Sequence, residues 1–216
     1  MNRMQSVVVV DTGIVNLKSV IRALAFVGAS IHSTSDYKRV LAADRVILPG
    51  VGAFPSGMSE LTASGLDDIM KEVAYMGKPI LGICLGMHLL LEFSEEHGHH
   101  AGLGLVKGSV VEIPSETTGI KKRKIPHVGW SPLSDSREPH KWNNSCLGNL
   151  PEGTFCYFSH SFMALPVNAD DVIATINYEG ISIVSALQHE NIVGIQFHPE
   201  LSGPAGLRIL ETFLAM

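Results

Sequence analysis

The sequence predicts an α/β fold in which a single domain, residues 1–216, holds a central mixed, mostly parallel sheet flanked by helices. The first half of the chain alternates strand and helix signals, which is typical of a parallel sheet with helices on both faces. The second half is richer in β-branched and aromatic runs. Hydrophobic residues make up 45% of the 216 residues and charged residues only 17%. This composition excludes disorder, which requires low hydrophobicity and high net charge.

The elements of the first half follow from apolar runs and helical spacing. Residues 7–10 are a continuous valine run, typical of a strand buried on both faces. We expect Asn16 to cap a helix that ends at Gly28. The other elements expected here are strands near Ile31 and at residues 46–48 and 79–83, and helices around residues 66–73 and 85–93.

The second half is expected to contain mostly strands. Strands are predicted at residues 106–113, 154–158, 172–177, 181–187 and 192–197, and a final helix at residues 204–214. Turns are expected at residues 177–180 and 189–191. Residues 115–127 and 133–150 are polar and are expected to be irregular.

Charge and cysteine content exclude several classes of protein. The net charge of −5 argues against a general nucleic-acid binder. The one dense basic run, residues 121–124, is expected to be a solvated loop, with a docking or phosphate-steering patch as the alternative. Three widely spaced cysteines give no disulfide framework, which favours a reducing, cytoplasmic setting. The longest uncharged stretch, residues 79–91, is shorter than the ~20 residues that a membrane span needs.

No cofactor and no metal are expected. The segment at residues 95–100 contains ligand-type side chains, but their spacing matches no closed zinc site.

The low charge content has two interpretations: a tightly packed Gly-rich domain, or a face that another subunit covers.

The strongest chemical motif is a cysteine between two glycines, where a predicted strand meets a predicted helix. Gly82, Cys84 and Gly86 form a G-x-nucleophile-x-G elbow. The turn is sharp, so small residues are needed where the backbone closes on itself. The N-terminus of the following helix would favour a thiolate and could bind an oxyanion. The alternative is a buried structural cysteine in a Gly-rich turn.

A general base for this cysteine is available at the end of the last predicted strand. His198 could move a proton between the thiol and a leaving amine near neutral pH. Glu200 could orient the ring through its second nitrogen. Alone, a histidine at a strand end is more often structural, but its co-occurrence with the elbow favours a catalytic triad.

A glycine-containing loop follows the strand at residues 46–48. Gly50 and Gly52 allow its backbone to approach a ligand closely and to turn its amides inward. An oxyanion hole requires such amides. By itself this loop indicates only a turn.

These elements, in this order, resemble the class I, triad-type glutamine amidotransferases. Further segments narrow the resemblance to glutaminase subunits of imidazole glycerol phosphate synthase, an enzyme of histidine biosynthesis. Those segments are residues 11–20, 49–54, 124–130, 157–162 and 196–200. Together they extend over nearly the whole chain.

The resemblance implies a role for each matching position. Cys84 would attack the side-chain amide of glutamine, His198 would transfer protons, and Glu200 would orient His198. The oxyanion would be held by the amides of Val51 and Leu85. Substrate contacts are implied for Gly50, Gly52, His88, Ser159, His160 and Ser161.

The resemblance also implies a partner. Ammonia would pass to a synthase, or cyclase, subunit with a (β/α)₈ barrel. The positions implied at that interface are Asn16, Pro126, His127 and Trp130. No nucleic acid or membrane partner is implied.

Three positions depart from the family pattern. His88 stands where the family usually has Gln, and it adds a titrating group. Thr12 and Val15 alter a loop expected near the partner. Two alternatives therefore stay open: a paralogous subunit that supplies ammonia for amination of a surface-polysaccharide sugar precursor, and a non-catalytic docking subunit.

Overall fold

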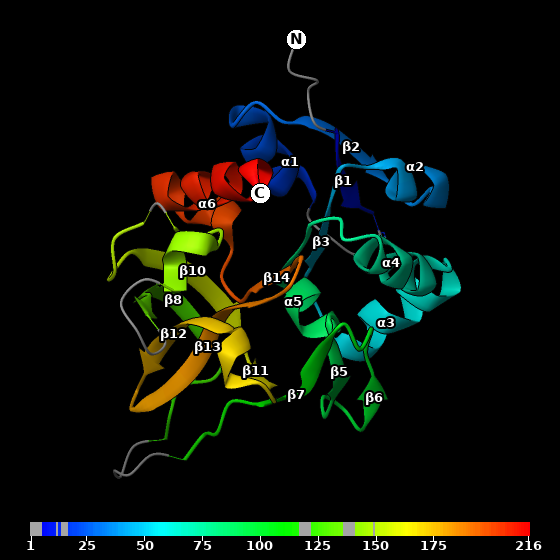
Figure 1. The fold of residues 1–216 in the computed structure, drawn as a ribbon. Coiled ribbons are helices and arrows are strands. Elements are labelled where there is room, and N and C mark those ends of the chain that lie inside the picture. The colour runs from blue at the N-terminus through cyan, green and yellow to red at the C-terminus, as the bar shows by residue number, and fades with distance from the viewer. Residues whose placement is uncertain (1–5, 12, 14–16, 117–121, 136–140, 149) are drawn as a thin grey trace.

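An eight-stranded sheet forms the centre of the computed structural model, which describes residues 6–11, 13, 17–116, 122–135, 141–148 and 150–216 (Figure 1). Its strand order is β2-β1-β3-β4-β14-β13-β12-β9. The pairs from β2 to β14 are parallel, and those from β14 to β9 are antiparallel. The predicted α/β fold with a mixed, mostly parallel sheet is confirmed.

The central strands are β1 (Ser6–Val10), β2 (Ser30–Thr34), β3 (Arg45–Gly50), β4 (Ile80–Cys84), β9 (Ser134–Asp135), β12 (Val172–Tyr178), β13 (Ile181–His189) and β14 (Ile192–Ile195). A four-stranded sheet contains β11 (Phe162–Pro166), β7 (Val106–Glu112), β5 (Leu91–Ser94) and β6 (His100–Ala101), in that order. A two-stranded ribbon pairs β8 (His127–Pro132) with β10 (Phe155–His160).

The helices are α1 (Leu17–Phe26), α2 (Tyr37–Ala42), α3 (Phe54–Ala63), α4 (Leu66–Tyr75), α5 (Leu85–Leu89) and α6 (Gly203–Ala215). Short 3₁₀ turns lie at η1 (Lys141–Asn144), η2 (Ala169–Asp171) and η3 (Pro199–Leu201). None of these described helices is long and apolar enough to cross a membrane.

Two hydrophobic cores lie on opposite faces of the central sheet because alternate side chains of each strand point to opposite faces. Val7 and Val9 face the core formed with α1, α6 and β10. Val8 and Val10 face the core formed with α2 to α5, β5 and β7. Burial of β1, β3, β4 and β14 on both sides explains their continuous apolar sequences.

The structure differs from the predicted elements in several places, and strands β6, β8 and β11 are among the elements that were not predicted. Helices α2 and α3 were not predicted, although the Asp36 side chain caps α2 by accepting from the amides of Lys38 and Arg39. The helix predicted at residues 85–93 ends at Leu89. Backbone amides of Leu103 and Leu105 donate to the carbonyls of Leu89 and Leu90, so these carbonyls are engaged by another segment. The stretch 133–150, predicted to be irregular, contains β9 and η1.

Candidate active site

The elbow is the junction between β4 and α5, and Cys84 stands at its apex. Its backbone has φ 53° and ψ −109°, a conformation that a non-glycine residue rarely adopts. A Cβ at Gly86 would lie 1.8 Å from the Leu48 carbonyl oxygen, and one at Gly82 would lie 2.7 Å from the Gly86 oxygen. The two glycines of the motif are therefore required by close packing of the backbone.

Gly50 supports the elbow from β3. A Cβ there would lie 2.8 Å from the Leu85 Cβ and 2.9 Å from the Gly86 amide nitrogen. Gly50 does not line the cavity beside the sulfur, whereas Val51, Gly52 and Leu85 do. The sequence predicts that Gly50 contacts substrate; in the structure it packs beneath the elbow and is not among the residues that line this cavity.

His198 and Glu200 form a buried pair next to the cysteine. His198 Nδ1 lies 2.9 Å from Glu200 Oε1, and the His198 amide donates to the Tyr157 carbonyl. Burial lowers the pKa of His198, but its interactions with Cys84 and Glu200 outweigh that effect and raise the pKa to about 10. The geometry thus favours an imidazolium beside the sulfur at neutral pH.

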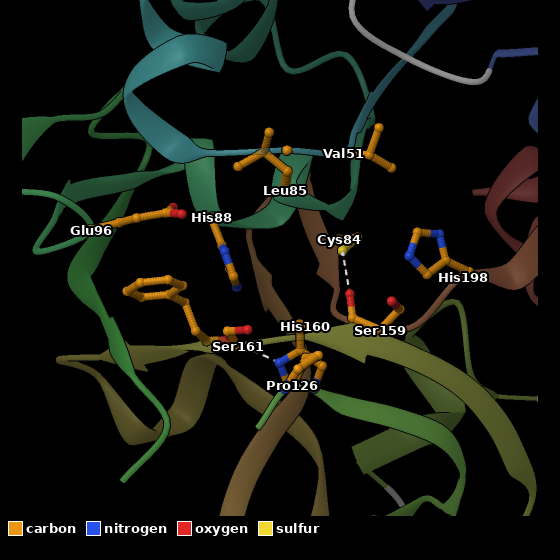
Figure 2. Close-up of a pocket in the computed structure, with 12 residues that line it drawn as sticks. Val51, Cys84, Leu85, His88, Glu96, Pro126, Ser159, His160, Ser161 and His198 are labelled. Atoms are coloured by element: carbon orange, nitrogen blue, oxygen red, sulfur yellow. Dashed lines mark hydrogen bonds between the residues drawn. The ribbon is translucent and has the colours of Figure 1, made fainter. Parts of the chain in front are cut away.

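A cavity of about 310 Å³ opens in front of the sulfur, within the size range of small-molecule sites (Figure 2). In that view the Cys84 sulfur lies between the side chains of His88 and His198. The sulfur lies 3.9 Å from the Ser159 carbonyl oxygen. The lining residues are Val51, Gly52, Cys84, Leu85, His88, Glu96, Pro126, Ser159, His160, Ser161, Phe162 and His198.

Glu96 is a cavity residue that the sequence reasoning missed. It lies in the segment 95–100, for which the sequence predicts no metal site, and its neighbours Glu95 and His97 are exposed. Glu96 itself is only 8% exposed, and its Oε2 accepts from the amide of Phe54. Nothing in the sequence distinguishes it from Glu95, because its burial depends on the packing of α3 against this loop.

Gln196 is the second residue without a predicted role, although it belongs to a motif segment. It is fully buried between His88 and Cys84. Its Oε1 lies 2.6 Å from His88 Nε2, and its Nε2 lies 3.8 Å from the Cys84 sulfur. Burial lowers the pKa of His88 to about 4, despite the opposing hydrogen bond to Gln196.

Two further histidines form a hydrogen-bonded chain that begins at the cavity wall, where His160 lies. His160 Nδ1 donates to the Phe162 carbonyl, so its Nε2 can accept from His127 Nδ1 at 3.1 Å. His127 Nε2 then accepts from the Ser131 hydroxyl. Burial lowers the pKa of His160 to about 3 and also lowers that of His127. Both rings are therefore neutral at pH 7.

The predicted partner residues fall into different environments. Trp130 is 54% exposed on the outer side of the β8–β10 ribbon, with Val128 and Phe155 exposed beside it. His127 is only 3% exposed, and its ring contacts Phe158 and Tyr178. Its side chain therefore packs on the inner side of the ribbon.

Pro126 lines the cavity. Asn16, Thr12 and Val15 lie outside the described residues.

Within the described ranges no group of three or more His, Cys, Asp or Glu side chains is placed to hold a metal. Burial raises the pKa of the Cys146 and Cys156 thiols to about 12.

One protein-family model matches nearly the whole chain. The model of the family "Glutamine amidotransferase class-I" matches residues 8–216. This range includes every described residue of the elbow, the His–Glu pair and the cavity.

Curated relatives share the full length of the chain. The "imidazole glycerol phosphate synthase subunit HisH 1" of Legionella pneumophila (strain Lens) is 44% identical over 211 residues, which cover 98% of this chain and 99% of that protein. The HisH subunit of Listeria monocytogenes serotype 4b (strain F2365) is 44% identical, with coverage of 96% and 94%. The HisH subunit of Bacillus cereus is 41% identical, with coverage of 96% and 93%.

Solved structures share the fold at lower identity. PurLQS from Thermotoga maritima has a TM-score of 0.71 at 17% identity and covers 99% of both chains. A structure described as a glutamine amidotransferase has a TM-score of 0.70 at 14% identity, with coverage of 97% of this chain and 99% of that chain.

Proposed function

The chain belongs to the class-I glutamine amidotransferase family, and on that premise we infer that it is the glutaminase subunit of an imidazole glycerol phosphate synthase. The inference is carried by relatives of that name at 41–44% identity over nearly the full chain. Its activity is the hydrolysis of glutamine to glutamate, with ammonia supplied to histidine biosynthesis.

We propose Cys84 as the nucleophile and His198 as the proton carrier. The thiolate attacks the side-chain carbonyl carbon of glutamine, and a C–S bond forms. The C–N bond then breaks as the His198 imidazolium protonates the leaving ammonia. Water, deprotonated by His198, releases glutamate from the γ-glutamyl thioester. The raised pKa of His198 supports an initial thiolate–imidazolium pair.

Glu200 is proposed to orient the ring of His198. Its carboxylate accepts from Nδ1, which leaves Nε2 for the sulfur and the substrate. The amides of Val51 and Leu85 are proposed to hold the tetrahedral oxyanion. Both residues line the cavity on the side of the sulfur, where the charge develops.

The cavity walls suggest how the amino-acid end of glutamine is held. We propose that Glu96 accepts from the α-ammonium group, because it is the one carboxylate among the lining residues described. Gly52 and His88, with the strand segment Ser159, His160 and Ser161, are proposed to contact the rest of the substrate.

A synthase subunit is the implied partner, and we propose that it carries a (β/α)₈ barrel. The exposed apolar surface of Val128, Trp130 and Phe155 is a suitable docking surface, since apolar aromatic groups are enriched at interface cores. Pro126, on the chain segment leading into this ribbon, borders the cavity. Docking there would bring the partner close to the ammonia source. We propose a cytoplasmic location, in keeping with three free thiols.

The test is reconstitution with a purified synthase subunit of the histidine pathway. We expect glutamate release to rise when that subunit and its own substrate are added, and imidazole glycerol phosphate to form. Glutamate release only with an enzyme that aminates a sugar precursor would contradict the histidine assignment. Absence of release with every partner at saturating glutamine would establish a docking subunit instead.

A further inference from the structure

We propose that His88 is a positioning residue that acts through Gln196, fixing an amide N–H of Gln196 on the Cys84 sulfur so that the thiolate is favoured. The proposal rests on the function proposed above, because it concerns the same nucleophile. It gives a physical role to the histidine that departs from the family pattern.

The three side chains form one buried line. Cys84 precedes α5, and His88 lies one turn further along this helix. Gln196 directly follows β14, and its backbone amide donates to the Ser185 carbonyl at 2.9 Å. Its side chain then spans the distance between the two, with 2.6 Å to His88 Nε2 and 3.8 Å to the sulfur. Because Gln196 is fully buried, its carboxamide has little freedom to turn elsewhere.

The direction of the hydrogen bonds among these three side chains decides which end of the Gln196 carboxamide faces the sulfur. A neutral imidazole carries one N–H, and a carboxamide has one donor end and one acceptor end. When His88 Nε2–H donates to Gln196 Oε1, the NH₂ group of Gln196 faces the sulfur. The reverse arrangement would put the carboxamide oxygen against a thiolate, which only accepts hydrogen bonds. The charged nucleophile therefore selects the arrangement in which His88 donates.

The other groups around the sulfur make this donor important. The Ser159 carbonyl oxygen, 3.9 Å away on β10, can accept from a neutral thiol but repels a thiolate. His198 faces the sulfur from the segment after β14 and favours the thiolate. His160 is a neutral ring whose pKa burial lowers to about 3, and Glu96 also lines the cavity. Among these described neighbours, Gln196 is the amide donor with a hydrogen bond to the sulfur.

The experiment measures the rate of Cys84 alkylation by iodoacetamide as a function of pH, on the full-length chain without glutamine or partner. Cys146 and Cys156 are fully buried, so peptide mass analysis should find the label on Cys84. Gln196→Met removes the N–H donor. His88→Met removes the donor to Gln196, and His88→Gln restores one, since a glutamine amide can also donate to Oε1.

The loss of a hydrogen bond to a charged group costs about 1.5 kcal/mol, which corresponds to about one pKa unit of the thiol. Below the pKa, one unit changes the thiolate fraction, and therefore the alkylation rate, about tenfold. We expect Gln196→Met to shift the midpoint of the alkylation pH profile upward by about one unit, which slows alkylation about tenfold at pH values below the wild-type midpoint. His88→Met should slow it by roughly three- to tenfold, and His88→Gln should return it to within about twofold of the wild type. Gln188→Met is the matched control, because Gln188 on β13 bonds only weakly to the Asn144 carbonyl at 3.5 Å. Its alkylation profile should match that of the wild type.

Two results would overturn the proposal. One is a folded Gln196→Met variant, judged by circular dichroism, with the wild-type rate and pH profile. The other is equal slowing in His88→Gln and His88→Met, which would mean that His88 only fills space. If Gln196→Met does not fold, the His88 pair decides alone. Because alkylation needs neither glutamine nor partner, its outcome is independent of whether the chain supplies ammonia to histidine synthesis.

Discussion

Replacement of His88 by glutamine should make the protein less sensitive to acid. Burial holds the pKa of His88 at about 4, against an ordinary value of 6.5. Between these two values the unfolded chain binds a proton that the folded chain excludes, so the free energy of unfolding falls as the pH falls. The free energy of unfolding is therefore unaffected by this histidine above pH 6.5, and it falls progressively as the pH drops from 6.5 toward 4.

The size of the effect follows from the same two values. At pH 5 the proton taken up by the unfolded state costs about 2 kcal/mol of stability, and at pH 7.5 the cost is close to zero. Glutamine has no titrating group and can still donate to Gln196 Oε1. The stability lost by His88→Gln between pH 7.5 and pH 5 should therefore be smaller than the wild-type loss by about 2 kcal/mol.

Equilibrium urea unfolding followed by circular dichroism measures this difference. With a typical slope of the unfolding free energy against urea concentration, a difference of about 2 kcal/mol separates the unfolding midpoints of the two proteins at pH 5 by about 1 M urea. His32→Gln, which replaces an exposed histidine on β2, should keep the wild-type acid sensitivity. Equal losses in wild type and His88→Gln would refute the reasoning, because His88 would then be protonated in the folded state.

Three further substitutions test the site. Glu200→Gln should lower kcat for glutamate release by about 10²-fold or more, because the ring of His198 loses the carboxylate that orients it and favours its imidazolium; an unchanged kcat would remove Glu200 from the triad. Glu96→Gln should raise KM for glutamine about tenfold with a much smaller change in kcat, measured by steady-state kinetics, whereas an unchanged KM would exclude an ammonium contact. Gly86→Ala should destabilise the protein by about 1–3 kcal/mol in urea unfolding, because its Cβ meets the Leu48 carbonyl. Gly57→Ala, whose Cβ would meet only side-chain ends, of Leu89 at 3.2 Å and of Leu85 at 3.3 Å, should cost less.

The parts of the site that the sequence predicted are those with a local steric or chemical requirement. The elbow is visible because Gly82 and Gly86 must be small wherever a strand turns sharply into a helix at Cys84. Likewise His198 and Glu200 are two residues apart, and the structure brings them within 2.9 Å. The parallel sheet could be predicted because burial on both faces forces continuous apolar runs in its strands.

The parts that were missed depend on contacts between distant segments. Glu96 is buried because the amide of Phe54, at the start of α3, meets it across 42 positions of sequence. The end of α5 at Leu89 depends on a loop 14 residues further along the chain. His127 shows the same limit: its position in a motif suggested a partner contact, but its ring packs against Phe158 and Tyr178. Spacing along the chain carries no signal for such contacts.

The proposed chemistry is tested most directly by trapping its covalent intermediate. The chain, mixed with its synthase partner and glutamine, would be quenched in acid during turnover and measured by intact-protein and peptide mass spectrometry. We predict one γ-glutamyl group on the peptide that contains Cys84, absent from Cys84→Ser, which should still support product formation from added ammonium in the complex. Glutamine turnover by Cys84→Ser, or a glutamyl group on another residue, would contradict the account.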